Sequence, residues 1–317
     1  MSVLVYAETD GGKLKKVALE VASYGKAVAD QMGTDVVAVT FNAKAAENLG
    51  NYGISKVLNI SYDGNFDAKV FASGIQQAVE QAKATVVIVS SSADSRFLTP
   101  LLAVSLDAGY ATNVVGLPLN LSPFMVKRSA FTNKAFTHNE LRSEKKIIGV
   151  SNNAFGLAEN PVSCSVEAFS PNVSAPNVVV QSVDKATDKV TIADAEVVVS
   201  GGRGLKGPEN WHLIEELAET LGAATACSKP VSDMGWRPHS EHVGQTGKPV
   251  ASNLYIAIGV SGAIQHLAGI NSSKVKVVIN NDPEAPFFKA ADYGIVGDAF
   301  EVVPKLIEKL KVFKAQA

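Results

Sequence analysis

Short runs of β-branched residues alternate with longer amphipathic stretches along this chain, and this rhythm constrains the fold more than any other feature. Thr85–Val89 is a continuous apolar run, as expected of a parallel strand that is covered on both faces. The other strands predicted in the first half are Val3–Tyr6, Asp35–Thr40 and Lys56–Ile60, and helices are predicted over 14–32, 67–84 and 91–107. This order predicts a parallel sheet with helices on both sides.

The alternation of strand and helix signals stops between about residues 114 and 188 and then resumes. This segment is β-rich and polar, with strands predicted over 145–150 and 177–183. After it, strands are predicted over 195–199, 254–258, 275–279 and 293–296, and helices over 208–221, from 262 onwards and over 299–312. A chain of 317 residues is long enough for about two domains. We therefore predict an α/β fold with two mostly parallel sheets flanked by helices: an N-terminal domain over 1–188 and a Rossmann-like domain over 189–317.

The composition excludes several classes of function. The formal net charge is −2 and no basic stripe is present, which argues against nucleic acid as a partner. Two distant cysteines, Cys164 and Cys227, exclude a disulfide scaffold and a cysteine-rich metal or iron–sulfur site. No metal-ligand motif, Walker A lysine or G-x-S-x-G elbow occurs, so we expect a cofactor carrier rather than an enzyme.

The N-terminus and the apolar runs bear on where the protein works. Met1–Tyr6 passes directly into a predicted strand, without a signal or transit segment. No apolar run reaches the ~18 residues of a membrane span. We therefore expect a cytoplasmic protein that does not insert into a membrane.

A glycine-rich segment follows the first strand of the second domain. Residues 202–207 match G-x-G-x-x-G, in which glycines permit a tight turn near the positive end of a helix. A dinucleotide site of this kind also needs an acid at the end of the next strand, and Ala223–Cys227 has none. The segment is therefore either part of a nucleotide site or a glycine-rich connection.

A second turn, Gly259–His266, leads from a buried strand into a predicted helix. Ser261 is expected to cap that helix, with the amides of Gly262 and Ala263 directed outward at its positive end, where a phosphate is favoured. Gln265 and His266 follow within the first turn. In the simpler interpretation Ser261 is only a cap and His266 is a hydrogen-bonded core residue.

Two further segments belong to the same predicted edge. The loop Val243–Lys248 is punctuated by glycines and offers amide and hydroxyl side chains. Asn280 and Asp298 each follow a predicted strand. Since ligands of open α/β sheets bind beyond the carboxyl ends of the strands, the coincidence of these segments predicts a ligand site there.

These residues resemble a known family. Ser261–Gly269, with the sequence S-G-A-I-Q-H-L-A-G, and Ala291–Val296, with the sequence A-D-Y-G-I-V, are similar to the FAD domain of electron transfer flavoprotein alpha subunits. The segments 198–204, 243–248 and 279–286 extend the resemblance, and the first half resembles the family more loosely. The resemblance implies a heterodimer with a beta subunit, in which an N-terminal domain like those of nucleotide hydrolases contacts the partner and the second domain binds FAD.

The resemblance also implies which residues bind FAD. They are Arg203, Ser228, Lys229, Val243, Gly244, Gln245, Thr246, Ser261, Gly262, Ala263, Ile264, Gln265, His266, Asn280, Asp298 and Ala299. Thr246 is expected at flavin N5 and His266 near the N1/C2 edge, Ser261 at phosphate, and Asn280 and Asp298 toward the adenosine half. Lys229 departs from the family, which usually has an arginine there; the charge is kept, but the planar guanidinium is lost.

The implied function is electron transfer. The chain is expected to take electrons from flavin dehydrogenases, such as the acyl-CoA dehydrogenases of fatty acid beta-oxidation, and to pass them to a quinone reductase or a similar acceptor. A subunit of an electron-bifurcating complex, with a second FAD on the partner, is an alternative. An NAD-dependent oxidoreductase using residues 202–207 is another, against which the missing ribose-binding acid counts.

Overall fold

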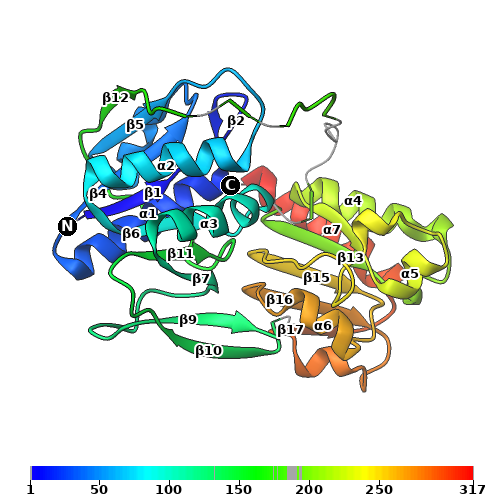
Figure 1. The fold of residues 1–317 in the computed structure, drawn as a ribbon. Coiled ribbons are helices and arrows are strands. Elements are labelled where there is room, and N and C mark those ends of the chain that lie inside the picture. The colour runs from blue at the N-terminus through cyan, green and yellow to red at the C-terminus, as the bar shows by residue number, and fades with distance from the viewer. Residues whose placement is uncertain are drawn as a thin grey trace. The chain divides into compact units, whose positions relative to one another are not determined.

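The computed structural model describes residues 2–131, 133–173, 175–176, 178–183, 191–192 and 195–316 (Figure 1). The chain divides into two compact units. The first is Met1–Ala130 with Phe136–Asp184, and the second is Lys185–Ala317 with the short segment Phe131–Ala135. The predicted boundary between residues 188 and 189 lies outside the described residues.

Unit 1 is built on a sheet in the order β10-β9-β7-β11-β6-β1-β4-β5-β12. Its strands are β1 (Ser2–Tyr6), β4 (Asp35–Phe41), β5 (Lys56–Ile60), β6 (Ala84–Ser90), β7 (Gly109–Val114), β9 (Phe124–Ala130), β10 (Ala135–Glu140), β11 (Lys146–Val150) and β12 (Ser165–Phe169). The run from β7 through β11, β6, β1, β4 and β5 to β12 is parallel, and β9 joins β7 antiparallel. β8 (Asn120–Leu121) pairs with β9, and β2 (Thr9–Asp10) pairs with β3 (Lys13–Leu14).

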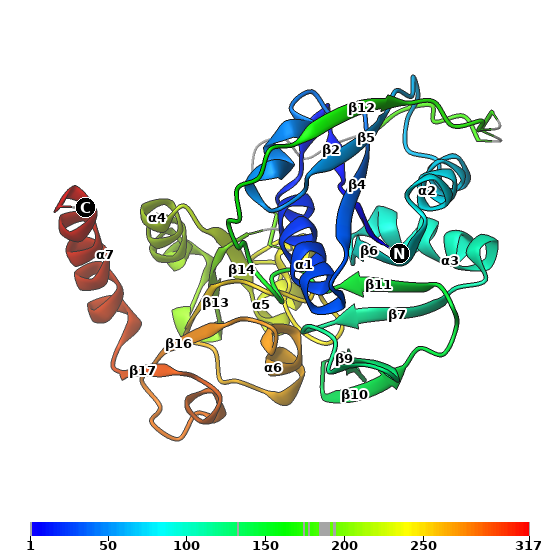
Figure 2. The ribbon, with the colours of Figure 1, turned by 90° about the vertical axis from the view of Figure 1, so that its left-hand side faces the viewer.

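Three helices cover the two faces of this sheet (Figures 1 and 2). Alternate residues of β1 point to opposite faces: Val3 and Val5 pack with α1 (Lys16–Met32), whereas Leu4 and Tyr6 pack with α2 (Ala68–Ala82) and α3 (Ala93–Leu106). Local capping sets where α2 and α3 begin. Oδ1 of Asp67 accepts from the amides of the first turn of α2, and Oγ of Ser92 accepts from Ser95 N at 3.0 Å.

The carboxyl ends of β1 and β6 are occupied by a buried carboxylate. Strand order reverses between these two strands, which is where an open α/β sheet ordinarily takes a ligand. Glu8, only 2% exposed, accepts hydrogen bonds there from the hydroxyls of Ser90, Ser92 (2.7 Å) and Ser95 (2.9 Å). Lys15 Nζ lies 3.0 Å from Glu8 Oε2. The crevice of unit 1 is therefore filled by the chain's own ion pair.

Unit 2 has a wholly parallel sheet in the order β14-β13-β15-β16-β17. Its strands are β13 (Val197–Gly201), β14 (Ala224–Cys227), β15 (Leu254–Ile258), β16 (Val275–Asn280) and β17 (Tyr293–Val296). In chain order this is 2-1-3-4-5, the flavodoxin-like winding, whose ligand crevice lies between β13 and β15.

Helices cover both faces of the second sheet as well (Figure 2). α4 (His212–Leu221) and α7 (Ala299–Gln316) pack against one face, through Ile214, Leu217 and Val303. The other face packs against Ile270 of α6 (Ile264–Ile270) and against Phe287. α5 (Lys229–Asp233) is a short helix after β14.

Several predicted boundaries differ from the structure. The strand predicted over 177–183 is wrong for residues 178–183, where the structure has no strand, and Val178 and Val179 are exposed because no neighbouring strand pairs with them. The helix predicted over 208–221 begins with a 3-10 turn, Pro208–Trp211, before α4. Among the described residues no helix is both long and apolar enough to cross a membrane.

Candidate functional site

The carboxyl ends of the unit 2 strands bring the predicted site residues to one edge of the sheet. All five strands run in the same direction, so the segments after them share that edge. Ser228 and Lys229 follow β14, Arg203 follows β13, and Ser261–His266 follow β15. Asn280 ends β16, and Asp298 lies two residues beyond β17.

The glycines after β13 pack against backbone. A Cβ built on Gly202 would lie 2.1 Å from the carbonyl oxygen of Gly259, and one on Gly204 would lie 2.6 Å from Gly259 Cα. Gly204 N donates to Gly259 O at 3.1 Å. The G-x-G match therefore allows the turns after β13 and β15 to touch, and it opens a 3-10 turn, Arg203–Leu205, in place of a helix. The side chain of Arg203 is exposed.

The Val243–Lys248 loop is held to the beginning of α6. Val243 N donates to Cys227 O at 3.0 Å, which ties the loop to β14. Gln245 N donates to Gln265 O at 2.7 Å. The backbones of Val243 and Gly244 are buried, and the side chains of Gln245 and Thr246 are exposed.

The turn after β15 differs from the prediction in its cap. α6 begins at Ile264 and its N-cap is Ala263, so Ser261 lies too early to cap it. Ser261 O instead accepts from Phe287 N at 3.1 Å. Within the described part of the chain, the amides of Gly262, Ala263, Ile264 and Gln265 have no acceptor. This leaves backbone donors at an exposed helix end, which suits an anion.

Of the two polar residues that follow this turn, one is exposed and the other is buried. Gln265 is exposed, whereas His266 is 6% exposed and its Nε2 lies 2.9 Å from Tyr255 Oη. Burial and, to a smaller extent, the neighbouring His242 lower the pKa of His266 to about 4, against a smaller opposing effect of the Val243 backbone. The His266 ring is therefore neutral at physiological pH and lies buried beneath the edge.

The residues after β14 combine a buried serine with an exposed cation. Ser228 is 7% exposed, and its amide donates to Gly201 O at 3.0 Å, which joins the ends of β14 and β13. Lys229 begins α5, and its side chain is exposed. A positive charge therefore stands at this edge of the sheet.

The residues after β16 and β17 are engaged within the chain. Asn280 Nδ2 donates to Val260 O at 3.1 Å, and its Oδ1 accepts from Asp282 N at 3.0 Å. Asp298 Oδ1 accepts from Phe300 N at 3.0 Å and so caps α7. Ala299 is buried in the core with α4, so its side chain does not reach the edge. Only the Ala299 backbone is available to a ligand.

Two residues beneath this edge were not among those predicted. Phe287 packs under Gly262, where a Cβ would lie 2.4 Å from Phe287 N. His242 is buried beneath the Val243–Lys248 loop. The sequence signal that could have found His242 is its closeness to His239, three residues earlier.

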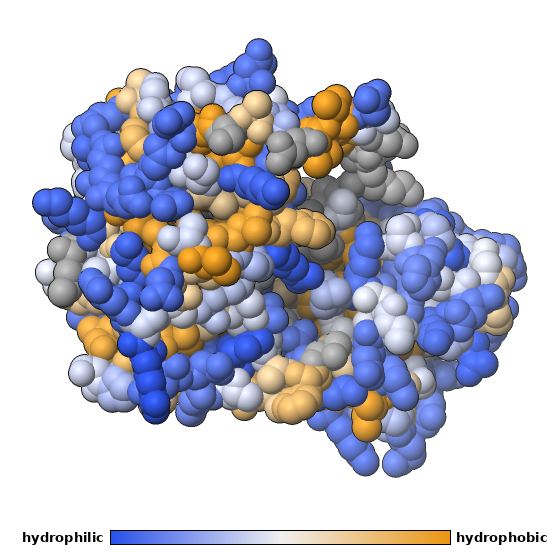
Figure 3. All heavy atoms as spheres, in the orientation of Figure 1, coloured by the Kyte–Doolittle hydropathy of each residue, from blue (hydrophilic) through white to orange (hydrophobic). Residues whose placement is uncertain are grey.

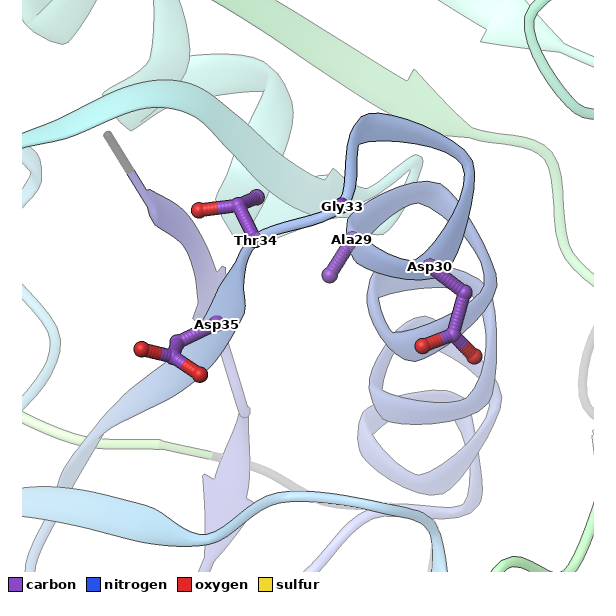
Figure 4. A pocket seen from close by; sticks show the side chains of 5 residues that line it. All are labelled: Ala29, Asp30, Gly33, Thr34 and Asp35. Atoms are coloured by element: carbon purple, nitrogen blue, oxygen red, sulfur yellow. The ribbon is translucent and has the colours of Figure 1, made fainter.

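A separate hollow lies in unit 1, lined by Ala29, Asp30, Gly33, Thr34 and Asp35 (Figure 4). It is at the end of α1 and the beginning of β4, the edge of the sheet opposite the strands' carboxyl ends. The side chains of Asp30 and Asp35 diverge, and Asp30 pairs with Lys26. Nothing in this hollow converges on a ligand.

Comparison with known proteins finds a family match for each of the two units. The model for the electron transfer flavoprotein domain matches residues 3–176, and that for the electron transfer flavoprotein FAD-binding domain matches residues 191–271. The electron transfer flavoprotein subunit alpha of Bacillus subtilis (strain 168) is 35% identical over 315 residues, which cover 98% of this chain and 97% of the relative. The subunits of the same name from Thermoanaerobacterium thermosaccharolyticum and Pseudomonas aeruginosa are each 34% identical, covering 98% and 96% of this chain and 98% and 99% of theirs.

Proposed function

This chain belongs to the electron transfer flavoprotein family, as an FAD-binding alpha subunit that carries electrons, and we propose that it holds FAD at the carboxyl edge of the unit 2 sheet. The chain forms a heterodimer with a beta subunit in the cytoplasm. Its electrons come from flavin dehydrogenases such as acyl-CoA dehydrogenases and go to a quinone reductase or a similar acceptor. The observation that carries this proposal is the convergence of exposed polar side chains and free amides on one edge.

The donors at this edge suit the parts of FAD. The amides of Gly262–Gln265 suit the pyrophosphate, since an exposed helix beginning favours an anion. The exposed hydroxyl of Thr246 suits flavin N5, and Gln245 lies beside it on the same loop. Asn280 and the cap at Asp298 stand toward the adenosine half, where the partly exposed Asp298 carboxylate is an available contact.

The protein's own groups set the electrostatic environment of the cofactor. FAD, when bound, accepts and releases electrons one or two at a time. Lys229 provides an exposed positive charge at the edge, and the beginning of α6 adds a partial one. His266 supports the N1/C2 side from beneath, as a neutral ring oriented by Tyr255. These groups favour negative charge on the cofactor.

A nicotinamide-binding role is not favoured by the glycine segment. Gly202 and Gly204 are needed because the turn after β13 touches Gly259 backbone. β14 ends at Cys227 and is followed by Ser228, so no carboxylate is available for a ribose at that position.

The partner surface is proposed on unit 1. Phe97, Leu101 and Val104 lie on the outer side of α3 and are 70%, 40% and 84% exposed. Figure 3 shows apolar surface over this helix. Apolar patches of this kind occur at protein interfaces, which supports contact with the beta subunit here.

Co-expression with a beta subunit, followed by an absorption spectrum and flavin quantitation, tests the function. One FAD per heterodimer, reduced by an acyl-CoA dehydrogenase and its substrate, is expected. Two FAD per heterodimer would indicate a bifurcating complex. A stable, folded heterodimer without flavin would contradict the proposed site.

A further inference from the structure

His242 lies beneath the loop that carries Gln245 and Thr246. The residue is only 2% exposed. A Cβ built on Gly247 would lie 2.4 Å from the His242 carbonyl oxygen and 2.9 Å from His242 Cγ, and one on Gly244 would lie 3.4 Å from Nε2. The loop therefore wraps around the imidazole, and its two glycines leave the space for the ring.

The loop is closed around His242 by its own backbone. Lys248 N donates to His242 O at 2.9 Å, and Gly247 N donates to Gly244 O at 3.1 Å. Gln245 N is in turn bonded to the beginning of α6. Because these bonds restrict the movement of the loop, we infer that the position of the His242 ring determines where the exposed side chains of Gln245 and Thr246 lie.

The His242 ring also has a buried nitrogen, Nδ1, without a hydrogen-bond partner among the described residues. Among the described residues, neither Nδ1 of His242 nor Nδ1 of His266 has a hydrogen-bond partner of normal geometry, although the Val243 backbone lies close to His266. Burial lowers the pKa of His242, His239 and Lys229 lower it further, and Asp233 opposes them. Buried polar atoms without partners are rare and often mark a functional role. His242 and His266 are therefore both neutral at physiological pH, and His242 is close enough to lower the pKa of His266. Both lie beneath the proposed flavin edge.

We propose that His242 is a positioning residue of the FAD site, whose ring holds Gln245 and Thr246 in place and takes up a proton when the cofactor gains negative charge. The proposal rests on FAD binding at this edge. The electron comes from the donor flavoprotein and remains on the cofactor, and the proton comes from water and binds the unprotonated nitrogen of the ring. No bond of the cofactor is broken.

The test uses the FAD-loaded heterodimer and the potential of its first one-electron reduction, measured by absorbance from about pH 5 to pH 8, because two-electron reduction also takes up protons on the flavin itself. In the unaltered protein the potential is expected to rise as the pH falls through the range in which histidine titrates. The substitutions His242→Gln and His242→Asn should abolish this rise. His239→Gln is the matched control: the centroid of this exposed ring lies 5.1 Å from that of His242, and the ring lowers the His242 pKa, so the variant should keep the rise but move it to higher pH.

The possible outcomes separate this proposal from the proposed function. Loss of FAD by both His242 variants at an unchanged melting temperature also supports the positioning role. A FAD-loaded variant whose potential follows the unaltered protein at every pH overturns the proposal alone. An unaltered heterodimer that is folded but holds no FAD overturns the proposed function instead.

Discussion

Tyr255 Oη and His266 Nε2 lie 2.9 Å apart in the interior of unit 2, so the histidine beneath the proposed flavin edge is oriented by a tyrosine from the adjoining strand. Tyr255 is fully buried, and burial raises the pKa of its hydroxyl. Both groups are therefore neutral. Their hydrogen bond fixes the orientation of the His266 ring.

Replacing Tyr255 by phenylalanine removes that bond and leaves Nε2 of His266 unpaired. The free energy of unfolding should fall by about 1–3 kcal/mol, the usual result of leaving a buried polar atom without a partner. Urea denaturation followed by fluorescence measures the change. An unfolding free energy equal to that of the unaltered chain would show that the bond contributes nothing to stability.

The stability of unit 2 should depend on pH through His266. Its pKa is about 4 when folded, below the ordinary value near 6.5, so the unfolded chain binds more protons between these limits. Stability is then fully present above pH 6.5 and is lost as the pH falls toward 4. Between pH 7 and pH 5 the contribution is about 2 kcal/mol. His266→Gln should lack this part of the pH dependence in urea titrations, and an identical loss in both proteins would contradict the assignment.

Removing the buried carboxylate of unit 1 should destabilise that unit. In Glu8→Ala, three serine hydroxyls and the Lys15 ammonium lose their shared acceptor. A loss of about 3 kcal/mol is expected, as for other buried pairs that lose one partner. Asp94→Asn is the control, because its 3.4 Å pair with Lys15 is partly exposed and should contribute under about 1 kcal/mol. Equal losses in both variants, measured by chemical denaturation, would disprove the special role of Glu8.

Lys229→Arg should change the cofactor without changing the fold. The side chain is exposed, so the free energy of unfolding should remain within about 0.5 kcal/mol. A planar guanidinium stacks on an aromatic ring where an ammonium cannot, and its closer positive charge should raise the one-electron potential of bound FAD. Redox titration of the heterodimer measures this, and an unchanged potential would refute the proposed effect of Lys229 on the cofactor.

The sequence predicted strands wherever an apolar run is bounded by turn signals, including the exposed edge strand β17. The predicted bounds of β5, β15 and β17 coincide with those of the structure, because turn signals flank each apolar run. β12 was not predicted, since Ser165–Phe169 is short and mostly exposed and pairs only with β5 among the described strands. Such pairing is tertiary and leaves little mark on local sequence.

The candidate site was predicted as a set of segments, but the directions of its side chains were not. The parallel order of the strands is enough to bring the segments together. That His266 points inward and Ala299 is buried depends on where α6 and α7 begin, and the beginning of α6 at Ile264 moves Ser261 out of the capping position. A shift of this size is within the ordinary uncertainty of a predicted helix start.

Ala263→Asp provides the most direct test of the claim that FAD is bound at this edge. Ala263 is the exposed N-cap of α6, and an aspartate there should cap the helix and maintain or raise stability. Its carboxylate would take the place proposed for the pyrophosphate and repel it. Flavin quantitation of the purified heterodimer should show FAD affinity falling by at least about tenfold, or roughly 1.4 kcal/mol, while Ala315→Asp, exposed near the end of α7, retains full FAD. Full FAD occupancy in a well-folded Ala263→Asp heterodimer would contradict the account.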